Sequence, residues 1–173
     1  PSSLSLYLRN PLEFYYQKVL KIKEKTTMES TINQMDKGNL VHEVVEQLYL
    51  PFQNQFLRVE DFEQMKTRLV PLMEKSYQSI YKGNQQKTGR NHIIFEVLKK
   101  SILDFIAIEQ KHVQQGNLIK ILQLEQKFEE SIRLPGIDFP LKLIGVIDRI
   151  DLYNDTLRII DYKTGMIQPR QLK

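Results

Sequence analysis

The chain has 173 residues, a formal net charge of +4 at pH 7 and 41% hydrophobic residues, which fits a single domain around one core. It has no cysteine, which excludes disulfides, thiolate zinc sites and cysteine-ligated iron–sulfur clusters. No apolar run approaches the ~18 residues of a membrane span and no signal peptide is visible, so we expect a cytoplasmic protein that contacts no membrane. The sequence begins at Pro1 and ends in a polar stretch, and we expect that it was excised from a longer protein.

Residues 1–116 show the apolar spacing of α-helices. Pro11 should break or kink the first helix after Asn10. The polar residues 24–37 predict a loop, and the composition of residues 82–91 predicts a linker. The predicted helices cover residues 1–20, 38–52, 60–81 and 92–116. The first of them carries four aromatic residues that we expect in the core: Tyr7, Phe14, Tyr15 and Tyr16.

After Gly116 the pattern changes to that of β-strands, which we expect over residues 117–165. The run "LIKILQLEQKFEESIRL" alternates as a strand does, and "PGID" predicts a turn. Two further β-rich runs, "FPLKLIGVIDRIDLY" and "TLRIIDYKT", are joined at Asn154 and Asp155. The predicted fold is α/β, with N-terminal helices packed on a small mixed β-sheet.

A tight hairpin loop centred on Asn154 and Asp155 would fix the register of the last two strands. It places Asp151 opposite Arg158, which is a favourable cross-strand ion pair and explains both charges without any function.

The same register places Asp148 opposite Asp161, where like charges are destabilising and the neighbouring isoleucines add partial burial. A divalent cation such as Mg²⁺ or Mn²⁺, which prefers carboxylate oxygens, would neutralise this pair. Lys163 shares a strand face with Asp161 and could orient or deprotonate a water, whereas the Tyr162 side chain points the other way and its backbone carbonyl could face the metal. The structural alternative is that both aspartates are solvated edge charges or are paired with Lys142, Lys163 or Arg149.

In four segments, taken in order, the sequence resembles the RecB/AddB-like branch of the PD-(D/E)XK nuclease superfamily. The segments are "SSLSLYLRNPLEFYYQKVLKI" (2–22), "GNLVHEVVEQLY" (38–49), "GVIDRID" (145–151) and "DYKTG" (161–165). Asn10 stands where the iron–sulfur members of this branch carry a cysteine, so no iron–sulfur cluster is expected. The Q-x-x-x-Y helix of the family should follow "DYKTG", and residues 166–173 hold only the start of that C-terminal part.

The resemblance implies a restriction-endonuclease-like core, with residues 1–173 as one nuclease domain. It implies hydrolysis of DNA phosphodiesters with Mg²⁺ or Mn²⁺, by an exonuclease that works in DNA repair or recombination beside a helicase subunit or helicase domain. The catalytic residues it implies are Asp148, Asp161 and Lys163. The metal ligands it implies are His42, Asp148, Asp161 and the Tyr162 carbonyl.

Alternatives stay open at two residues and for the function. Glu125, on the strand before the hairpin, is either one more metal ligand or an exposed strand residue. Without the resemblance, His42 is a polar residue on a helix edge. The rival function is a catalytically inactive DNA-binding or scaffolding domain of a helicase–nuclease complex, and a second rival is a nuclease for structured DNA or RNA. The sequence assigns no residue to nucleic-acid binding and no polarity of cleavage.

Overall fold

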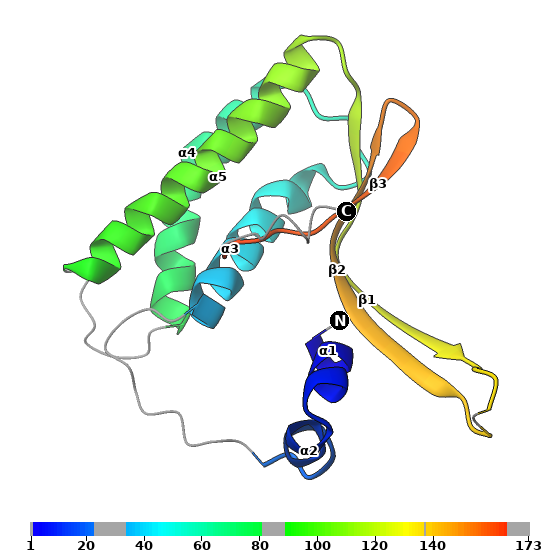
Figure 1. Ribbon diagram of the computed structural model, residues 1–173. Coiled ribbons are helices and arrows are strands. Elements are labelled where there is room, and N and C mark those ends of the chain that lie inside the picture. The colour runs from blue at the N-terminus through cyan, green and yellow to red at the C-terminus, as the bar shows by residue number, and fades with distance from the viewer. Residues whose placement is uncertain (1, 23–33, 81–88, 137, 166–173) are drawn as a thin grey trace.

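The computed structural model describes residues 2–22, 34–80, 89–136 and 138–165, which form a layer of helices beside a three-stranded sheet (Figure 1). The helices are α1 (Ser2–Arg9), α2 (Pro11–Phe14), α3 (Gln34–Tyr49), α4 (Val59–Ile80) and α5 (Arg90–Gln114), with a π-helical turn η1 (Tyr15–Val19) and a 3₁₀ turn η2 (Leu50–Phe52). The strands are β1 (Ile119–Ile132), β2 (Leu141–Tyr153) and β3 (Thr156–Ile160).

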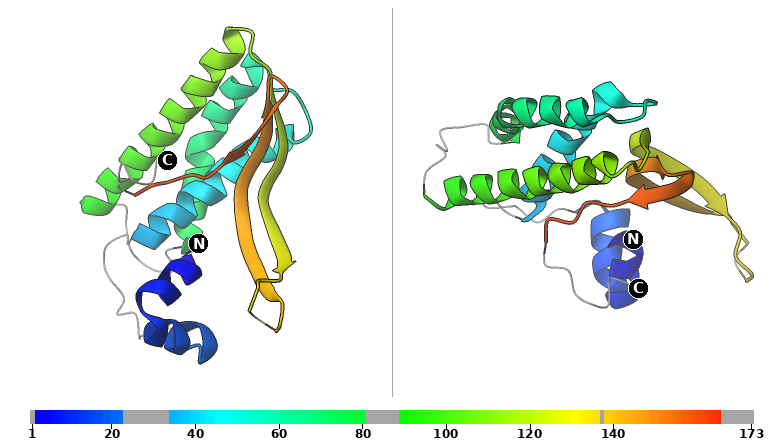
Figure 2. Two further views of the ribbon diagram at one scale, coloured as in Figure 1. Left: turned by 45° about the vertical axis from the view of Figure 1, so that its right-hand side comes forward. Right: turned by 90° about the horizontal axis from the view of Figure 1, so that it is seen from above.

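The hydrophobic core lies where α3, α4 and α5 meet one another and the start of the sheet (Figure 2). Helix α3 buries the apolar face that its spacing predicts, including Val45 and Leu48, and α4 presents Leu69 to it. Ile119 and Ile121 at the beginning of β1 are fully buried against the same core. Burying each such side chain contributes ~1.5–3 kcal/mol, so this face fixes α3 against the sheet.

The N-terminal segment forms short helices, as predicted, but does not join the core. Helix α1 ends before Pro11, and the side chain of Asn10 accepts a hydrogen bond of 3.1 Å from the backbone N–H of Glu13 at the start of α2. The prediction that its aromatic residues are core was wrong, since Tyr7 is 51% exposed and packs edge-on against Phe14. Helical spacing identifies an apolar face but not what covers it.

The structure describes only the ends of the two predicted connections, the loop over residues 24–37 and the linker over residues 82–91. Residues 34–37 were predicted as loop but form the first turn of α3, because the first turn of a helix needs no apolar residues. The predicted linker 82–91 overlaps α5, which begins at Arg90 after Gly89. The remaining parts of both predicted connections lie outside the described residues.

The sheet has the order β1-β2-β3, and all of its pairs among the described residues are antiparallel, so the expectation of a mixed sheet was wrong there. The predicted hairpin register is confirmed, with Asp151 opposite Arg158. Its ladder ends with Arg149 opposite Ile160, one position before the expected pair of aspartates. Beyond the core, β1 and β2 continue as a two-stranded ribbon (Figures 1 and 2).

The β2–β3 turn allows a test of its geometry, since Asn154 and Asp155 both have positive φ, 46° and 64°. The left-handed conformation costs a non-glycine residue ~1 kcal/mol, and glycine avoids this cost. Glycine also has more conformational freedom in the unfolded chain, which cancels part of the gain, so Asp155→Gly should stabilise the protein by on the order of 0.5 kcal/mol. Urea denaturation measures the change. The control is Asn154→Gly, which loses the 2.7 Å hydrogen bond from the Leu118 N–H to the Asn154 side chain. Equal gains from both variants would contradict this account.

Candidate metal centre

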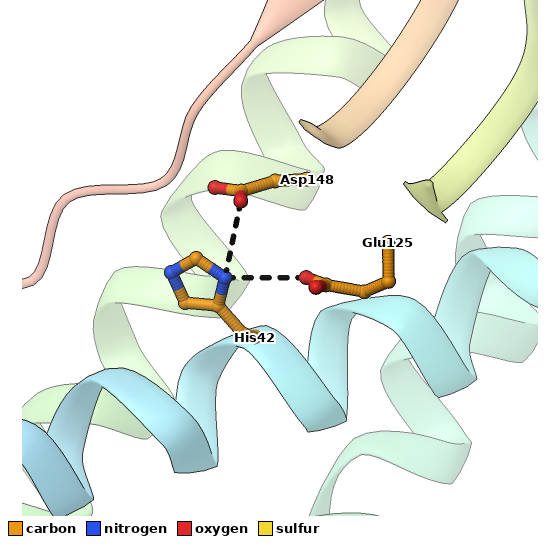
Figure 3. Close-up of side chains that lie close together, drawn as sticks. All are labelled: His42, Glu125 and Asp148. Carbon is orange, nitrogen blue, oxygen red and sulfur yellow. Dashed lines mark hydrogen bonds and ion pairs between the residues drawn. The ribbon is translucent and has the colours of Figure 1, made fainter. Parts of the chain in front are cut away.

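His42 projects from α3 toward the sheet, at the boundary between the buried and exposed faces of the helix (Figure 3). Its Nδ1 lies 3.2 Å from Glu125 Oε1 and 3.4 Å from Asp148 Oδ1. Its Nε2 lies 3.1 Å from the carbonyl oxygen of Tyr162. The imidazole is therefore surrounded by oxygen atoms from two strands and from the segment after β3.

The two carboxylates come from neighbouring strands. The pairs Leu124–Arg149 and Gln126–Ile147 flank them, so Glu125 of β1 is level with Asp148 of β2. Glu125 has a φ of 46°, a strained conformation for a residue with a side chain, in a strand whose register also shifts nearby. The distorted backbone brings the Glu125 side chain to His42, so this residue lies inside the cluster and not out in solvent.

Tyr162 connects the end of the hairpin to this cluster through its backbone. Its N–H donates a 2.7 Å hydrogen bond to Asp148 Oδ2, and its carbonyl faces His42. Its ring packs edge-on against Phe105 of α5 and against the His42 ring. The residue thus has its ring in the packing and its carbonyl at the cluster.

Asp161 and Lys163, on either side of Tyr162, are not gathered into the cluster. Their side chains are 56% and 62% exposed, and Lys163 Nζ lies 2.6 Å from Asp161 Oδ2. Since side chains alternate along an extended chain, the inward Tyr162 sends both neighbours outward. The crowded carboxylates are consequently Glu125 and Asp148, whereas the expected pair was Asp148 and Asp161.

The donor set fits a divalent cation. The ligand atoms of His42, Glu125 and Asp148 all lie within 4.8 Å of one another. Carboxylate and carbonyl oxygens suit Mg²⁺ and Mn²⁺, and an imidazole nitrogen favours Mn²⁺ over Mg²⁺. The set contains no sulfur, since the chain has no cysteine.

A cleft of about 460 Å³ opens beside the cluster and gives it access to solvent. Its lining is Gly38, Asn39, His42, Glu43, Glu46 and Glu125. Burial raises the pKa of the Glu46 carboxyl, and the charges of Glu125 and Glu43 raise it further. The cleft therefore has a negative potential that a bound cation would relieve.

Behind the cluster, Arg149 makes a buried salt bridge with Asp151 and Glu109. The predicted pair of Asp151 and Arg158 is confirmed, at 2.8 Å. Sequence reasoning missed Glu109. A signal was present, because Glu109 lies three residues after Ile106 and seven after Ile102, on the buried face of α5.

No helix among the residues that the structure describes is long and apolar enough to cross a membrane. The model of the PD-(D/E)XK nuclease superfamily matches residues 1–173. No solved structure matches the chain.

Several curated proteins are similar to this chain over nearly its whole length. A Rickettsia felis protein named only "Uncharacterized protein" is 26% identical over 177 residues, which cover 99% of this chain and 20% of the relative. An ATP-dependent helicase/deoxyribonuclease subunit of Desulfitobacterium hafniense is 27% identical over 177 residues, covering 94% of this chain and 14% of the relative. Its counterpart in Clostridium perfringens is 25% identical over 175 residues, covering 95% and 15%.

The chain thus spans a fifth or less of the length of these relatives. The family match, by contrast, covers every residue of the chain, including the helix with His42 and both strands with its carboxylate neighbours. On that match the chain belongs to the PD-(D/E)XK nuclease superfamily, and its helices and antiparallel sheet are part of a restriction-endonuclease-like α/β fold.

Proposed function

We propose that this chain is the metal-dependent deoxyribonuclease domain of a longer cytoplasmic protein and that it hydrolyses DNA phosphodiesters as an exonuclease. The observation that carries the proposal is the convergence of His42, Glu125 and Asp148 beside an open cleft. Two relatives are named as subunits of an ATP-dependent helicase/deoxyribonuclease, which supports DNA as the substrate and a helicase subunit or domain as the partner. A role in repair or recombination follows from that pairing, and the net charge of +4 is compatible with DNA binding.

His42, Glu125, Asp148 and the Tyr162 carbonyl would hold Mg²⁺ or Mn²⁺. When bound, such a cation polarises a phosphate and lowers the pKa of a water. The protein's own part is to orient these four groups. The Tyr162 N–H holds one oxygen of Asp148 and leaves the other directed at the cluster.

Asp161 and Lys163 complete the site in this proposal. Both flank Tyr162, whose backbone is held at the cluster, and both are exposed and paired with each other beside it. On this proposal their mutual ion pair would open when DNA binds, Asp161 would become a further carboxylate available to the site, and Lys163 would orient a water or neutralise phosphate charge. An exposed ion pair contributes little stability, ~0–1 kcal/mol, so its opening costs little.

One observation favours the rival function. The described geometry keeps Asp161 and Lys163 outside the cluster, as a domain that binds DNA or holds a complex together without cutting would tolerate. Against it, the ligand atoms of His42, Glu125 and Asp148 lie within 4.8 Å of one another, an arrangement that suits a bound cation. Metal binding and cleavage, measured separately, distinguish the two functions.

Metal binding is tested first by thermal unfolding with Mn²⁺. At a concentration 100-fold above its Kd, Mn²⁺ should stabilise the wild type by about 2.7 kcal/mol through mass action. His42→Ala and Asp148→Asn should lose this shift, and Asp161→Asn should keep most of it, because Asp161 lies outside the cluster in the absence of DNA. The control Glu130→Gln, an exposed carboxylate on β1, should keep it in full. A full shift in His42→Ala would place the metal elsewhere.

Cleavage is tested on end-labelled linear DNA with Mn²⁺, in a protein that extends past Lys173. Lys163→Ala should lower the rate by ~10²–10⁴-fold, as expected for loss of a group that activates water, and should leave Mn²⁺ binding intact. Covalently closed circular DNA is the matched substrate, and its resistance would identify an exonuclease. A wild type that binds Mn²⁺ and cuts neither DNA would support the scaffolding role.

The raised pKa of Glu46 predicts a pH-dependent stability. Because its folded-state pKa lies above its unfolded-state pKa, ionising Glu46 destabilises the protein progressively as the pH rises through these values. Glu46→Gln should therefore increase the free energy of unfolding at pH 7, and the gain should vanish near about pH 3, where Glu46 is protonated in both states. Saturating Mg²⁺ should reduce the gain, since it offsets the Glu125 charge. A gain that is independent of pH would contradict this origin.

A further inference from the structure

A buried ion network lies directly behind the candidate metal centre. Arg149, which is 0% exposed, donates hydrogen bonds of 3.0 and 2.8 Å to the two carboxylate oxygens of Glu109. It also donates a 2.8 Å hydrogen bond from Nε to Asp151 Oδ2. Both carboxylates are buried. All three charges are therefore taken out of water, and their arrangement depends on the direction of the guanidinium.

Two further residues complete the network. The hydroxyl of Tyr49 donates a 2.6 Å hydrogen bond to Glu109, and the Arg149 guanidinium lies 4.6 Å from the centre of the Tyr49 ring. Arg158 donates to both oxygens of Asp151, at 2.8 and 2.9 Å. Two guanidinium groups balance two carboxylates, and the network joins α3, α5, β2 and β3.

The network meets the metal centre on three of the four segments that supply ligands, and the fourth is β1 with Glu125. Arg149 follows Asp148 directly on β2, so one peptide unit connects them. On α3, Tyr49 lies seven residues, about two helical turns, after His42 and therefore on the same side of the helix.

The third segment is the one after β3. Tyr162 contacts Asp148 and His42 through its backbone, and its buried hydroxyl, which has no hydrogen-bond partner among the described residues, is close enough to Arg149 and Glu109 for their charges to act on it.

Stability alone does not account for such a network. Replacing a buried ion pair by apolar residues of similar size is often neutral or stabilising, whereas removing one partner leaves an uncompensated charge. A buried guanidinium instead fixes the orientation of its neighbours, because its planar fork donates hydrogen bonds only to partners in fixed positions. Here the fork binds Glu109 of α5 and Asp151 of β2, and Tyr49 of α3 joins through its hydrogen bond to Glu109 and its contact with the guanidinium.

We propose that Arg149 is a positioning residue of the candidate metal centre. Anchored by Glu109 and Asp151, it holds α3 and β2 so that His42, Asp148 and the Tyr162 carbonyl stay within reach of one cation. The inference rests on the proposed function for the identity of the centre, but the geometry it describes exists without metal.

The test uses two variants of the full chain and one control. Arg149→Met combined with Glu109→Gln removes one charge of each sign and leaves the pair of Asp151 and Arg158 intact. Arg149→Lys keeps the charge and loses the fork, and it decides the question if the double variant does not fold. The control is Leu69→Ala on α4, a buried truncation that lowers stability without touching the network.

The first readout is the NMR spectrum of the His42 imidazole in metal-free protein, assigned against His42→Ala. The chain has three histidines, and the other two are His92 and His112. In the folded variants the His42 signals should move toward those of a free imidazole, and in Leu69→Ala they should not. The second readout is Mn²⁺ affinity by calorimetry, which should fall at least tenfold in the variants only.

The outcomes separate this inference from the proposed function. Folded variants with wild-type His42 signals and wild-type Mn²⁺ affinity would show that the network serves stability alone and overturn the inference. A wild type that fails to bind Mn²⁺ would contradict the proposed metal centre. In that case the imidazole signals still decide whether Arg149 positions His42.

Discussion

The backbone of Tyr162 makes the contact on which the arrangement of this domain depends. Its N–H binds Asp148 and its carbonyl faces His42, so one peptide segment joins the sheet to the helical layer. These bonds explain why the chain leaves the hairpin after Ile160: the peptide groups of residue 162 pair with side chains instead of with β2. The same bonds turn Asp161 and Lys163 outward. One local choice of hydrogen-bond partners thus decides which charged residues lie in the cluster and which lie at its rim.

The charged side chains of this domain form two layers, which differ in whether their charges balance. The inner layer, around Arg149, is neutral, since every buried charge has an opposite partner with good hydrogen-bond geometry. The outer layer, around His42, has two carboxylates and no permanent cation between them. A cation would offset the like charges of the outer layer, whereas the inner layer has no unbalanced charge for it to offset. The neutral layer keeps that imbalance confined to one face of β2.

Much of the fold follows from sequence patterns that act locally. The register of β2 and β3 is predictable because Asn154 and Asp155 tolerate positive φ and fix a two-residue turn. The buried face of α3 is predictable from its apolar spacing. The exposure of Tyr7 is not, because a helix with an apolar face carries no information about distant partners.

The residues of the candidate site also differ in how far local sequence patterns predict them. The sequence points to Asp148 because a symmetric hairpin would place it opposite Asp161, but His42 needed the resemblance to a family, since a lone polar residue on a helix has no signature. Glu125 was ambiguous because its backbone, at a φ of 46°, departs from the alternation on which strand arguments rest. The placement of Asp161 was missed because the ladder ends one pair earlier than the symmetric hairpin implies.

The long sequence separations within the cluster have a consequence for the order of events during synthesis. His42 and Glu125 are 83 residues apart, and His42 and Tyr162 are 120 residues apart. Contacts between such distant residues close large loops and therefore form late in folding. A chain still emerging from the ribosome has α3 and its histidine long before it has the hairpin. On the proposed function, metal binding by these groups would have to wait until the chain as far as Tyr162 has left the ribosome.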